Sequence, residues 1–509
     1  MADMNFKANS LIRSAIVSSI VLTPFVMFVT RALQNQNSDN LIPIFVSTDH
    51  FTTFFWGQNR FGNVLPLLAL PIQSIKLNLV FQVYLRAFSI VFVLLWLSLV
   101  MAHITKANKF LMSVLSLLVG FGWIWNYTDG LDSLVYGAVP HVNSVLFAVF
   151  AVYLLSCTGY ASSDKSVLWK LIFSIGSLIF WGVAAWASLL IVIWSPALVM
   201  IFLALENDES RKNRVSLLGR FFVHLTPAAI AAFFFAKIAI SGGQQSSWGS
   251  YGVREAIRTN PYIYNNLIIA IVLIVLSLIL VRGMRHILLI TSSASFLIGI
   301  PVIAGFAHVK AYYSMPRYFG VPLLFAVLIP ALFICGSCLA MLGSRVHLHF
   351  PRIPKHALAL FAGLAVVVLA ILGSQQVKHG SGKPDAVGFV NSATSLKVEQ
   401  FLVIENSQSR NLQFISGNFW RVWPTVFELR SHGQEVLGIT KLAINQSQFS
   451  RLYSGQTLYG LCIDEVEKCH GSAINAQLDD RRLRTEVRET PIAQMSDGTS
   501  IRLMTVTYP

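Results

Sequence analysis

The sequence predicts a polytopic α-helical membrane protein with a soluble α/β domain at its C-terminal end. Of its 509 residues, 55% are hydrophobic and only 12% are charged, whereas soluble globular proteins carry about 25% charged residues. The mean hydropathy is +0.63. Apolar runs long enough to cross a bilayer recur up to residue 373, and the composition then turns polar.

A spanning helix needs roughly 20 predominantly apolar residues, and about eleven runs meet that requirement. They cover residues 11–33, 79–103, 109–126, 142–159, 168–186, 188–205, 218–240, 264–281, 286–306, 320–342 and 357–373. Only a short break near residue 187 separates the fifth run from the sixth. A single long helix there is the alternative, and it would reverse the side of every later segment.

Basic residues predict the orientation, because cytoplasmic loops of membrane proteins are enriched in Lys and Arg. Lys7 precedes the first run and Arg13 lies at its beginning; the run lacks a signal-peptidase site and is expected to remain as an anchor. With eleven spans, later Lys and Arg residues fall mostly on the same side, while residues 127–141 contain none. We therefore expect a cytoplasmic N-terminus and a C-terminal domain on the external side of the membrane.

The net charge of +15 does not indicate a nucleic-acid partner. The basic residues are scattered among short loops, where they set topology or meet anionic lipid headgroups. The sequence also contains no phosphate-binding loop of the Walker type, no dinucleotide-binding glycine motif and no serine nucleophile elbow. Transport driven by ATP from this chain alone is therefore disfavoured.

The first predicted external loop, residues 34–78, is the largest polar interruption in the first half of the chain. Its segment 47–62 combines Asp49, His50 and Arg60 with aromatic residues that include Trp56. An acid, a base and an aromatic cluster at a membrane surface suit chemistry on an amphiphilic substrate. An ordinary interfacial loop with an aromatic belt is the alternative. The second half of the loop, residues 64–76, predicts a helix lying along the membrane surface.

Two later external loops also contain residues suited to catalysis or ligand binding. Residues 126–141 contain Asp129 and Asp132, which can orient hydroxyl groups of a substrate or hold a divalent cation, although a solvated turn explains them equally well. Residues 308–319 contain His308, Lys310 and Arg317. These cations can bind a phosphate or anchor a helix end at the headgroups.

Residues 374–385 form a linker rich in Gly, Ser and Pro, and residues 386–509 are long enough for one small domain. The patterns predict strands at 412–416, 436–440 and 457–463, helices at 396–404 and 418–430, and a hairpin within 491–506. Within this domain Trp420, Trp423 and Phe427 share a helical face, which predicts core packing against the strands, with docking on the membrane domain as the alternative. Cys462 and Cys469 are expected to form a disulfide in an oxidising compartment.

The acid-bearing first loop, the interfacial segment, the acidic second loop and the late Arg-Tyr-x-x-x-Pro arrangement of Arg317, Tyr318 and Pro322 occur together. In this combination residues 1–373 resemble the GT-C superfamily of membrane glycosyltransferases, in its bacterial branch similar to protein mannosyltransferases and aminoarabinose transferases. Members transfer a sugar from a polyprenyl-phosphate carrier on the external face. The resemblance implies a protein of the bacterial inner membrane with a cytoplasmic N-terminus and a periplasmic C-terminal domain. Many have an Asp-Glu pair where this chain has Asp49 and His50, which leaves Asp39 as the alternative acid.

The resemblance implies that Asp49 is a general base for the acceptor hydroxyl, and pairing with Arg60 or capping of a helix is the alternative role for this carboxylate. It also implies that Arg317, with Lys310, His308 and Arg60, binds the donor phosphate. A further set of residues is expected to orient substrate: Asp129, Asp132, His50, Tyr318 and Trp56. The expected partners are a lipid-linked sugar donor, membrane lipids and a glycan, lipid or protein acceptor, with a divalent cation as a possible cofactor.

Three other classes remain open from the sequence. A flippase or transporter of lipid-linked sugars would use charges inside the membrane, and Arg86 is one of few such residues in the predicted spans. A polysaccharide polymerase would share the many spans and the external loops. A non-catalytic assembly protein would use the C-terminal domain to bind partners.

Overall fold

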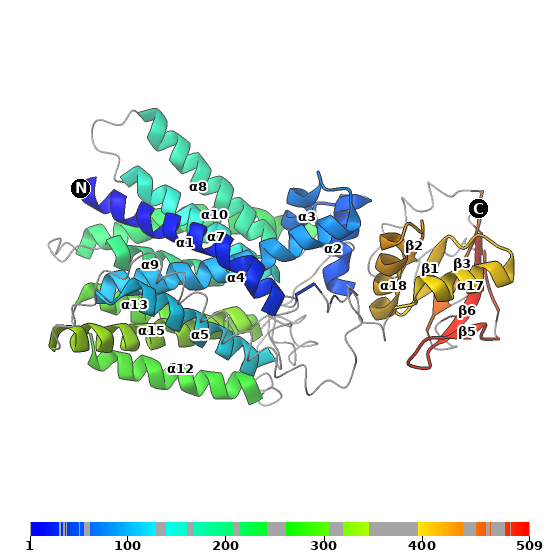
Figure 1. Cartoon of the computed structure of the whole chain (residues 1–509). Helices are drawn as coiled ribbons and strands as arrows, with labels where there is room; N and C mark the ends of the chain where they lie inside the picture. The colour runs from blue at the N-terminus through cyan, green and yellow to red at the C-terminus, as the bar shows by residue number, and fades with distance from the viewer. Residues whose placement is uncertain are drawn as a thin grey trace. The chain divides into compact units, whose positions relative to one another are not determined.

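The computed structural model divides the chain into two compact units (Figure 1). The first comprises Met1–Thr30, Arg60–Gly62 and Tyr84–Ser381, and the second comprises Arg31–Asn59, Asn63–Val83 and Gly382–Pro509. The structure describes residues 2–29, 32–33, 36, 38–49, 51–54, 62–128, 139–159, 167–206, 214–241, 261–281, 283–304, 319–345, 395–440, 455–464, 469, 484–488 and 490–507.

Long apolar helices make up the first unit. They are α1 (Ala2–Val29), α4 (Ile75–Thr105), α5 (Lys109–Thr128), α7 (Val139–Gly159), α8 (Val167–Ala187), α9 (Ile191–Glu206), α10 (Arg214–Ser241), α12 (Pro261–Ile279), α13 (Met284–Ala304) and α15 (Gly320–Arg345). The beginning of α4 belongs to the second unit. Each predicted run from 11–33 to 320–342 coincides with one of these helices. The run 357–373 and the linker 374–385 lie outside the described residues.

Six helices in the described part of the chain are long and apolar enough to cross a membrane. They lie in α1, α4, α8, α10, α13 and α15, while α5, α7, α9 and α12 contribute shorter apolar stretches. A mostly helical protein with several candidate membrane spans is therefore confirmed. The count of about eleven spans and their orientation stay predictions from residue patterns.

Helices α8 and α9 are separate, so the single long helix considered above is not formed. Helix α8 ends at Ala187 and α9 begins at Ile191. Between them, the backbone N–H of Ser188 donates to the carbonyl of Ala184 at 3.0 Å. The Ser188 hydroxyl lies 2.8 Å from Nδ1 of the buried His141. The chain thus turns at Ser188, and its hydroxyl is satisfied inside the helical unit.

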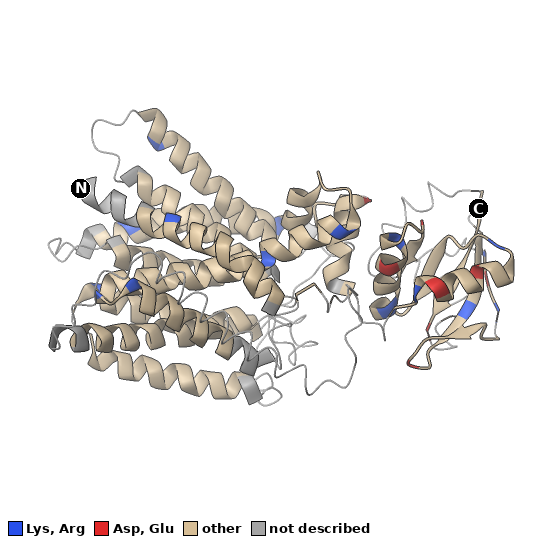
Figure 2. Cartoon of the chain, in the orientation of Figure 1, with Lys and Arg blue, Asp and Glu red and all other residues tan. Residues whose placement is uncertain are grey.

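The helices differ in how much of their surface the protein itself covers. In the most apolar stretch of α4, 89% of the residues are buried. In the corresponding stretches of α8 and α10, 17% and 22% of the residues are buried. The uncovered side chains are apolar, as Leu171 and Ile175 on α8 illustrate. Figure 2 shows few charged residues along these helices. Helix α4 is therefore a central helix, and α8 and α10 present surfaces suited to lipid.

Serine hydroxyls join neighbouring helices inside the first unit. Ser144 of α7 donates to the carbonyl of Ala184 in α8 at 2.8 Å. Ser293 of α13 donates to the carbonyl of Ala326 in α15 at 2.9 Å. Both serines are fully buried. Small residues let the helices approach closely. Their hydroxyl groups form hydrogen bonds with the neighbouring helix, so that these polar groups are paired in an apolar environment.

A mixed sheet forms the C-terminal part of the second unit. Its strands are β1 (Phe414–Gly417), β2 (Leu437–Ile439), β3 (Thr457–Ile463), β4 (Arg484–Val487), β5 (Ala493–Gln494) and β6 (Ser500–Thr507). The order is β2-β1-β3-β6-β4, and β5 pairs with β6. Strand β1 is parallel to β2 and β3, and β6 is antiparallel to β3. The helices are α17 (Val398–Gln408) and α18 (Phe419–Ser431). The predicted strands, helices and hairpin of this α/β region are confirmed, and β4 was not predicted.

Helix α18 follows β1 through a tight turn. Gly417 has φ +116°, a conformation that favours glycine. Asn418 caps the helix, because its side-chain oxygen accepts the N–H of Trp420 at 2.9 Å. Trp423 packs directly over Gly438 of β2, where an added Cβ would lie 2.6 Å from its ring. The helix therefore covers one face of the sheet at close range.

The face shared by three aromatic residues of α18 was only partly predicted. Trp423 and Phe427 are buried as expected. Trp420, however, is 48% exposed, and its ring stands edge-on to Phe419 with centroids 5.1 Å apart. Its place in the first turn explains the difference, since the sheet contact begins one turn later at Trp423.

The other face of the sheet carries a small core and the disulfide. Phe414, Ile439 and Met504 pack there with Cys462 and Cys469. The disulfide joins Cys462 in β3 to Cys469 with a Cα–Cα distance of 5.9 Å. It closes a short loop directly after a central strand and so restrains the chain where it leaves the sheet.

The polar segment after α1 belongs to the second unit and contains two short helices, α2 (Ser38–Thr48) and α3 (Val64–Ala69). The sequence predicts a loop where α2 forms. The predicted interfacial helix over 64–76 is also wrong in extent, because α3 ends at Ala69 and α4 already begins at Ile75. Leu67 and Leu68 of α3 are exposed.

Candidate functional site

Asp49 stands directly after the last residue of α2, a helix whose other side chains are largely buried. Leu41, Phe45 and Val46 are at most 1% exposed. The backbone N–H of Asp49 donates to the carbonyl of Phe45 at 2.8 Å and closes the last turn. The fixed helix therefore presents this one carboxylate at its end.

A buried polar network holds α2 against the beginning of α4. Ser47 donates to the side-chain oxygen of Asn78 at 2.9 Å, and Gln82 donates to the same oxygen at 2.8 Å. Gln82 also donates to the carbonyl of Pro43 at 3.1 Å. Pro43 lies inside α2 and has a fixed backbone torsion. Such a buried, bonded network fixes one side of α2.

Helix α18 packs against α2 within the same unit. Ser38 at the start of α2 donates to the carbonyl of Phe419 at 2.6 Å. In the middle, the rings of Phe45 and Trp423 lie 5.4 Å apart between centroids. The beginning of α18 thus meets the beginning of α2, and their aromatic side chains meet one to two turns further on.

The end of this contact is an ion pair between Asp49 and Arg430. Nη1 of Arg430 lies 2.5 Å from Oδ2 of Asp49, and the side chains are 24% and 27% exposed, respectively. Oδ1 accepts the hydroxyl of Thr48 at 3.0 Å. The Arg430 guanidinium also lies over the Phe45 ring, 5.5 Å from its centroid. Among the described residues, the partner of this carboxylate is therefore Arg430.

Arg430 was missed by sequence reasoning, which considered Arg60 as the partner. Arg60 lies outside the described residues. The two members of the observed pair are 381 positions apart, and no local pattern connects them. Only the packing of α18 on α2 brings them together.

A carboxylate in this arrangement can accept further hydrogen bonds. An ionised carboxylate has about four lone-pair positions on its two oxygens. The two hydrogen bonds described above use one position on each oxygen. The remaining positions and the exposed fraction leave room for an approaching hydroxyl.

Most other predicted site residues lie outside the part of the chain that the structure describes. They are His50, Trp56, Arg60, Asp129, Asp132, His308, Lys310, Arg317 and Tyr318. Asp39 lies in α2, but its side chain is not described. The described residues contain no group of three or more His, Cys, Asp or Glu able to hold a metal ion. The expected role of Asp129 and Asp132 with a divalent cation is therefore untested.

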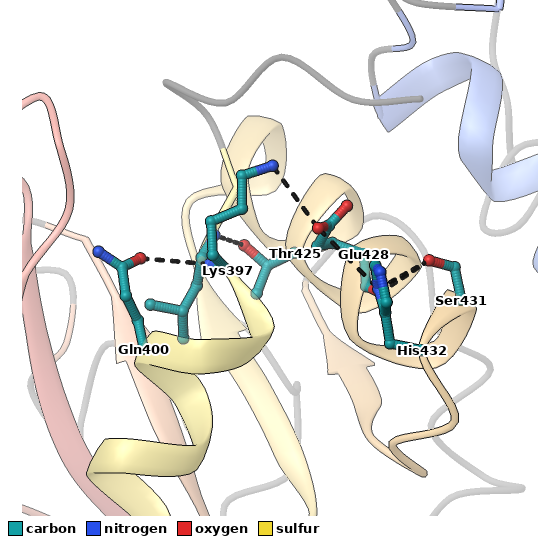
Figure 3. A network of polar contacts seen from close by, with 7 residues as sticks. Lys397, Gln400, Thr425, Glu428, Ser431 and His432 are labelled. Atoms are coloured by element: carbon teal, nitrogen blue, oxygen red, sulfur yellow. Dashed lines mark hydrogen bonds and ion pairs between the residues drawn. The ribbon is translucent and has the colours of Figure 1, made fainter. Parts of the chain in front are cut away.

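A second polar cluster joins the C-terminal end of α18 to the beginning of α17 (Figure 3). Lys397 lies 3.6 Å from the carboxylate of Glu428. Thr425 accepts the backbone N–H of Leu396 at 3.0 Å. These contacts cross between the two helices and stabilise their packing.

Ser431, His432 and Glu428 within this cluster do not form a catalytic triad. In a triad the imidazole binds the acid through one nitrogen and the hydroxyl through the other. Here Nδ1 of His432 faces both groups, 3.2 Å from the Ser431 hydroxyl and 4.0 Å from the Glu428 carboxylate. The Ser431 hydroxyl instead donates to the Glu428 carbonyl at 2.9 Å.

The sequence matches no model of a known protein family, and no curated protein matches it significantly. The likeness to GT-C glycosyltransferases therefore rests on the residues and motifs quoted above.

Proposed function

We propose that this protein is a membrane glycosyltransferase that moves a sugar from a polyprenyl-phosphate carrier to an acceptor on the external face. The observation that carries the proposal is Asp49, a partly exposed carboxylate held at the end of a buried helix. This segment directly follows the first candidate span. The sequence motifs shared with GT-C enzymes support the same activity.

In the proposed reaction an acceptor hydroxyl attacks the anomeric carbon of the sugar. The new C–O bond forms as the bond to the carrier phosphate breaks, and the phosphate leaves with the electron pair. Asp49 takes the proton of the hydroxyl, so that the attacking oxygen gains nucleophilicity as the bond forms. Charge builds up on the leaving phosphate, and cations there lower the barrier.

Arg317 is the proposed cation for that phosphate, because a guanidinium binds two phosphate oxygens at once. Lys310, His308 and Arg60 are the further candidates. This assignment rests on the sequence alone, including the Arg-Tyr-x-x-x-Pro arrangement at Arg317.

A flippase or transporter of lipid-linked sugars is the second candidate. Arg86 in α4 supports it, because this side chain is only 3% exposed within the most buried of the candidate spans. Ionisable residues inside a membrane often mark a translocation path. A polysaccharide polymerase remains the third candidate.

Transfer from radiolabelled polyprenyl-phosphate sugars to a membrane-extract acceptor pool tests the proposal, using purified full-length protein. We expect transfer by the wild type and a large loss with Asp49→Asn, which keeps the size of the side chain. Transfer by both proteins would support the enzyme class and would assign the general base to Asp39 or to an acid of the second external loop, residues 126–141. Specific donor binding without transfer would favour the flippase.

A further inference from the structure

The carboxylate of Asp49 occupies an electrostatically unfavourable position. It follows the C-terminal end of α2, where the partial negative charge of the helix dipole disfavours an anion. A neutral residue would be more stable there. A nearby cation compensates an unfavourable charge of this kind.

Arg430 supplies that cation from a favourable position of its own. It lies in the last turn of α18, where the helix dipole favours a positive charge. Its guanidinium is further held over the ring of the buried Phe45, a cation–π arrangement. The C-terminal ends of α2 and α18 therefore carry side chains of opposite charge. The ion pair between these side chains stabilises both helix ends.

The remainder of the contact restricts how this pair can move. The Ser38–Phe419 hydrogen bond and the Phe45–Trp423 contact set the register of α18 on α2. The network of Ser47 and Asn78 fixes the opposite side of α2. The Asp49 carboxylate extends beyond these fixed contacts, and its hydrogen bonds with Arg430 and Thr48 hold it in the described position.

We propose that Arg430 is a positioning residue for Asp49, through which the C-terminal α/β domain orients the carboxylate of the first polar segment. This inference rests on the proposed glycosyltransferase function. Arg430 itself does not need to touch substrate. It holds one carboxylate oxygen, so that the free lone pairs point in a constant direction for the acceptor hydroxyl.

The test uses the full-length protein with Arg430→Gln, Arg430→Lys and the charge exchange Asp49→Arg/Arg430→Asp. Arg410→Gln is the matched control, because Arg410 lies in the same domain with its guanidinium 4.6 Å from the Tyr459 ring centroid. Hydrogen exchange in peptides covering residues 38–49 reports on the ion pair without requiring activity. We expect Arg430→Gln to speed exchange at the end of α2 about two- to fivefold, and the charge exchange to reverse this.

Transfer from radiolabelled polyprenyl-phosphate sugars gives the second readout. We expect Arg430→Gln to lower kcat roughly 10- to 100-fold, as a displaced catalytic group does, at an unchanged KM for the donor. Arg430→Lys should recover part of kcat, and Arg410→Gln should leave it unchanged. The charge exchange should restore slow hydrogen exchange without restoring transfer, because no carboxylate then remains at position 49.

Two results would overturn the inference. An unchanged kcat in Arg430→Gln would show that the pair does not orient a catalytic group. Transfer restored by the charge exchange would show that the pair is structural and that the base lies elsewhere. Absence of transfer by the wild type would instead refute the proposed function and the positioning role with it, while hydrogen exchange would still report on the ion pair.

Discussion

Phe45 of the first polar segment and Trp423 of the C-terminal domain pack with their ring centroids 5.4 Å apart. Both are at most 2% exposed. These residues join segments almost 400 positions apart into one folded unit, since α2 alone is too short to be stable as an isolated helix. The C-terminal domain and the segment that carries Asp49 therefore depend on each other.

Replacement of Trp423 should destabilise this unit strongly. Trp423→Ala removes a buried side chain that contacts both Phe45 and Gly438, and we expect a loss of about 3–5 kcal/mol in the free energy of unfolding. Limited proteolysis of the full-length protein should then cut residues 38–49 as well as the C-terminal domain. Trp420→Ala on the same helix is the control, because Trp420 is half-exposed and its loss should cost less than about 1 kcal/mol. Equal effects of the two substitutions would contradict the packing described here.

Gly438 tests the close approach of α18 to the sheet. An added Cβ would lie 2.6 Å from the Trp423 ring, so Gly438→Ala should cost about 1–3 kcal/mol through overpacking. Thermal unfolding monitored by tryptophan fluorescence measures this change. The matched control is Gly433→Ala, where no atom lies within 4 Å but φ is +89°. Its cost should come from backbone strain alone, and it should not alter the fluorescence of the native state.

The disulfide should stabilise the sheet. Opening the loop between Cys462 and Cys469 by Cys462→Ala/Cys469→Ala should lower the free energy of unfolding by about 2–4 kcal/mol. Reductant should lower the Tm of the wild type and leave that of the double variant unchanged. A Tm of the wild type that is insensitive to reductant under unfolding conditions would show that the bond contributes little.

The hairpin between β5 and β6 should show a defined response to acid. Burial opposes ionisation of Asp497, but hydrogen bonds from Thr499 and Arg421 outweigh it and lower the pKa of this carboxyl from 3.8 to about 2. Its contribution to stability is therefore fully present above pH 4 and is lost as the pH falls through 2. Because the side chain is 30% exposed, the contribution should not exceed about 1 kcal/mol.

Comparison with Asp497→Asn isolates this effect, since other carboxylates titrate in the same range. The stability difference between wild type and variant should be constant at neutral pH and shrink between pH 4 and pH 2. It should also shrink in high salt. A difference that persists unchanged at pH 2 would show that it does not come from the charge of Asp497.

Much of the architecture was predictable because its determinants are local. The apolar runs coincide with helices, since length and composition alone decide whether a segment can form an apolar helix of spanning length. The strands at 412–416, 436–440 and 457–463 were recognised from β-branched and aromatic residues between turn signals. The hairpin around Gly498 followed from its Ser-Asp-Gly turn, and Gly498 indeed has φ +86°.

Helix α2 was missed for an equally physical reason. It contains Pro43 and spans only 11 residues, and such a segment gains little from its own hydrogen bonds. Its stability comes from burial against α18 and α3 and from hydrogen bonds to the beginning of α4, and α18 is far from it in the chain. The predicted interfacial helix over 64–76 was overlong for a related reason: the hydrogen bonds from Asn78 to the carbonyls of Ala69 and Ile72 hold the turn that ends α3.

The sequence by itself determined that this is a mostly helical protein with several candidate membrane spans and a C-terminal α/β region, because composition and periodicity act over a few turns. It also singled out Asp49. Only the tertiary structure decided what surrounds that carboxylate: an arginine 381 positions away, brought to 2.5 Å by the packing of α18 on α2. An ion pair of this kind depends on the relative position of two helices, and that position is set by the whole buried interface rather than by any neighbouring residue.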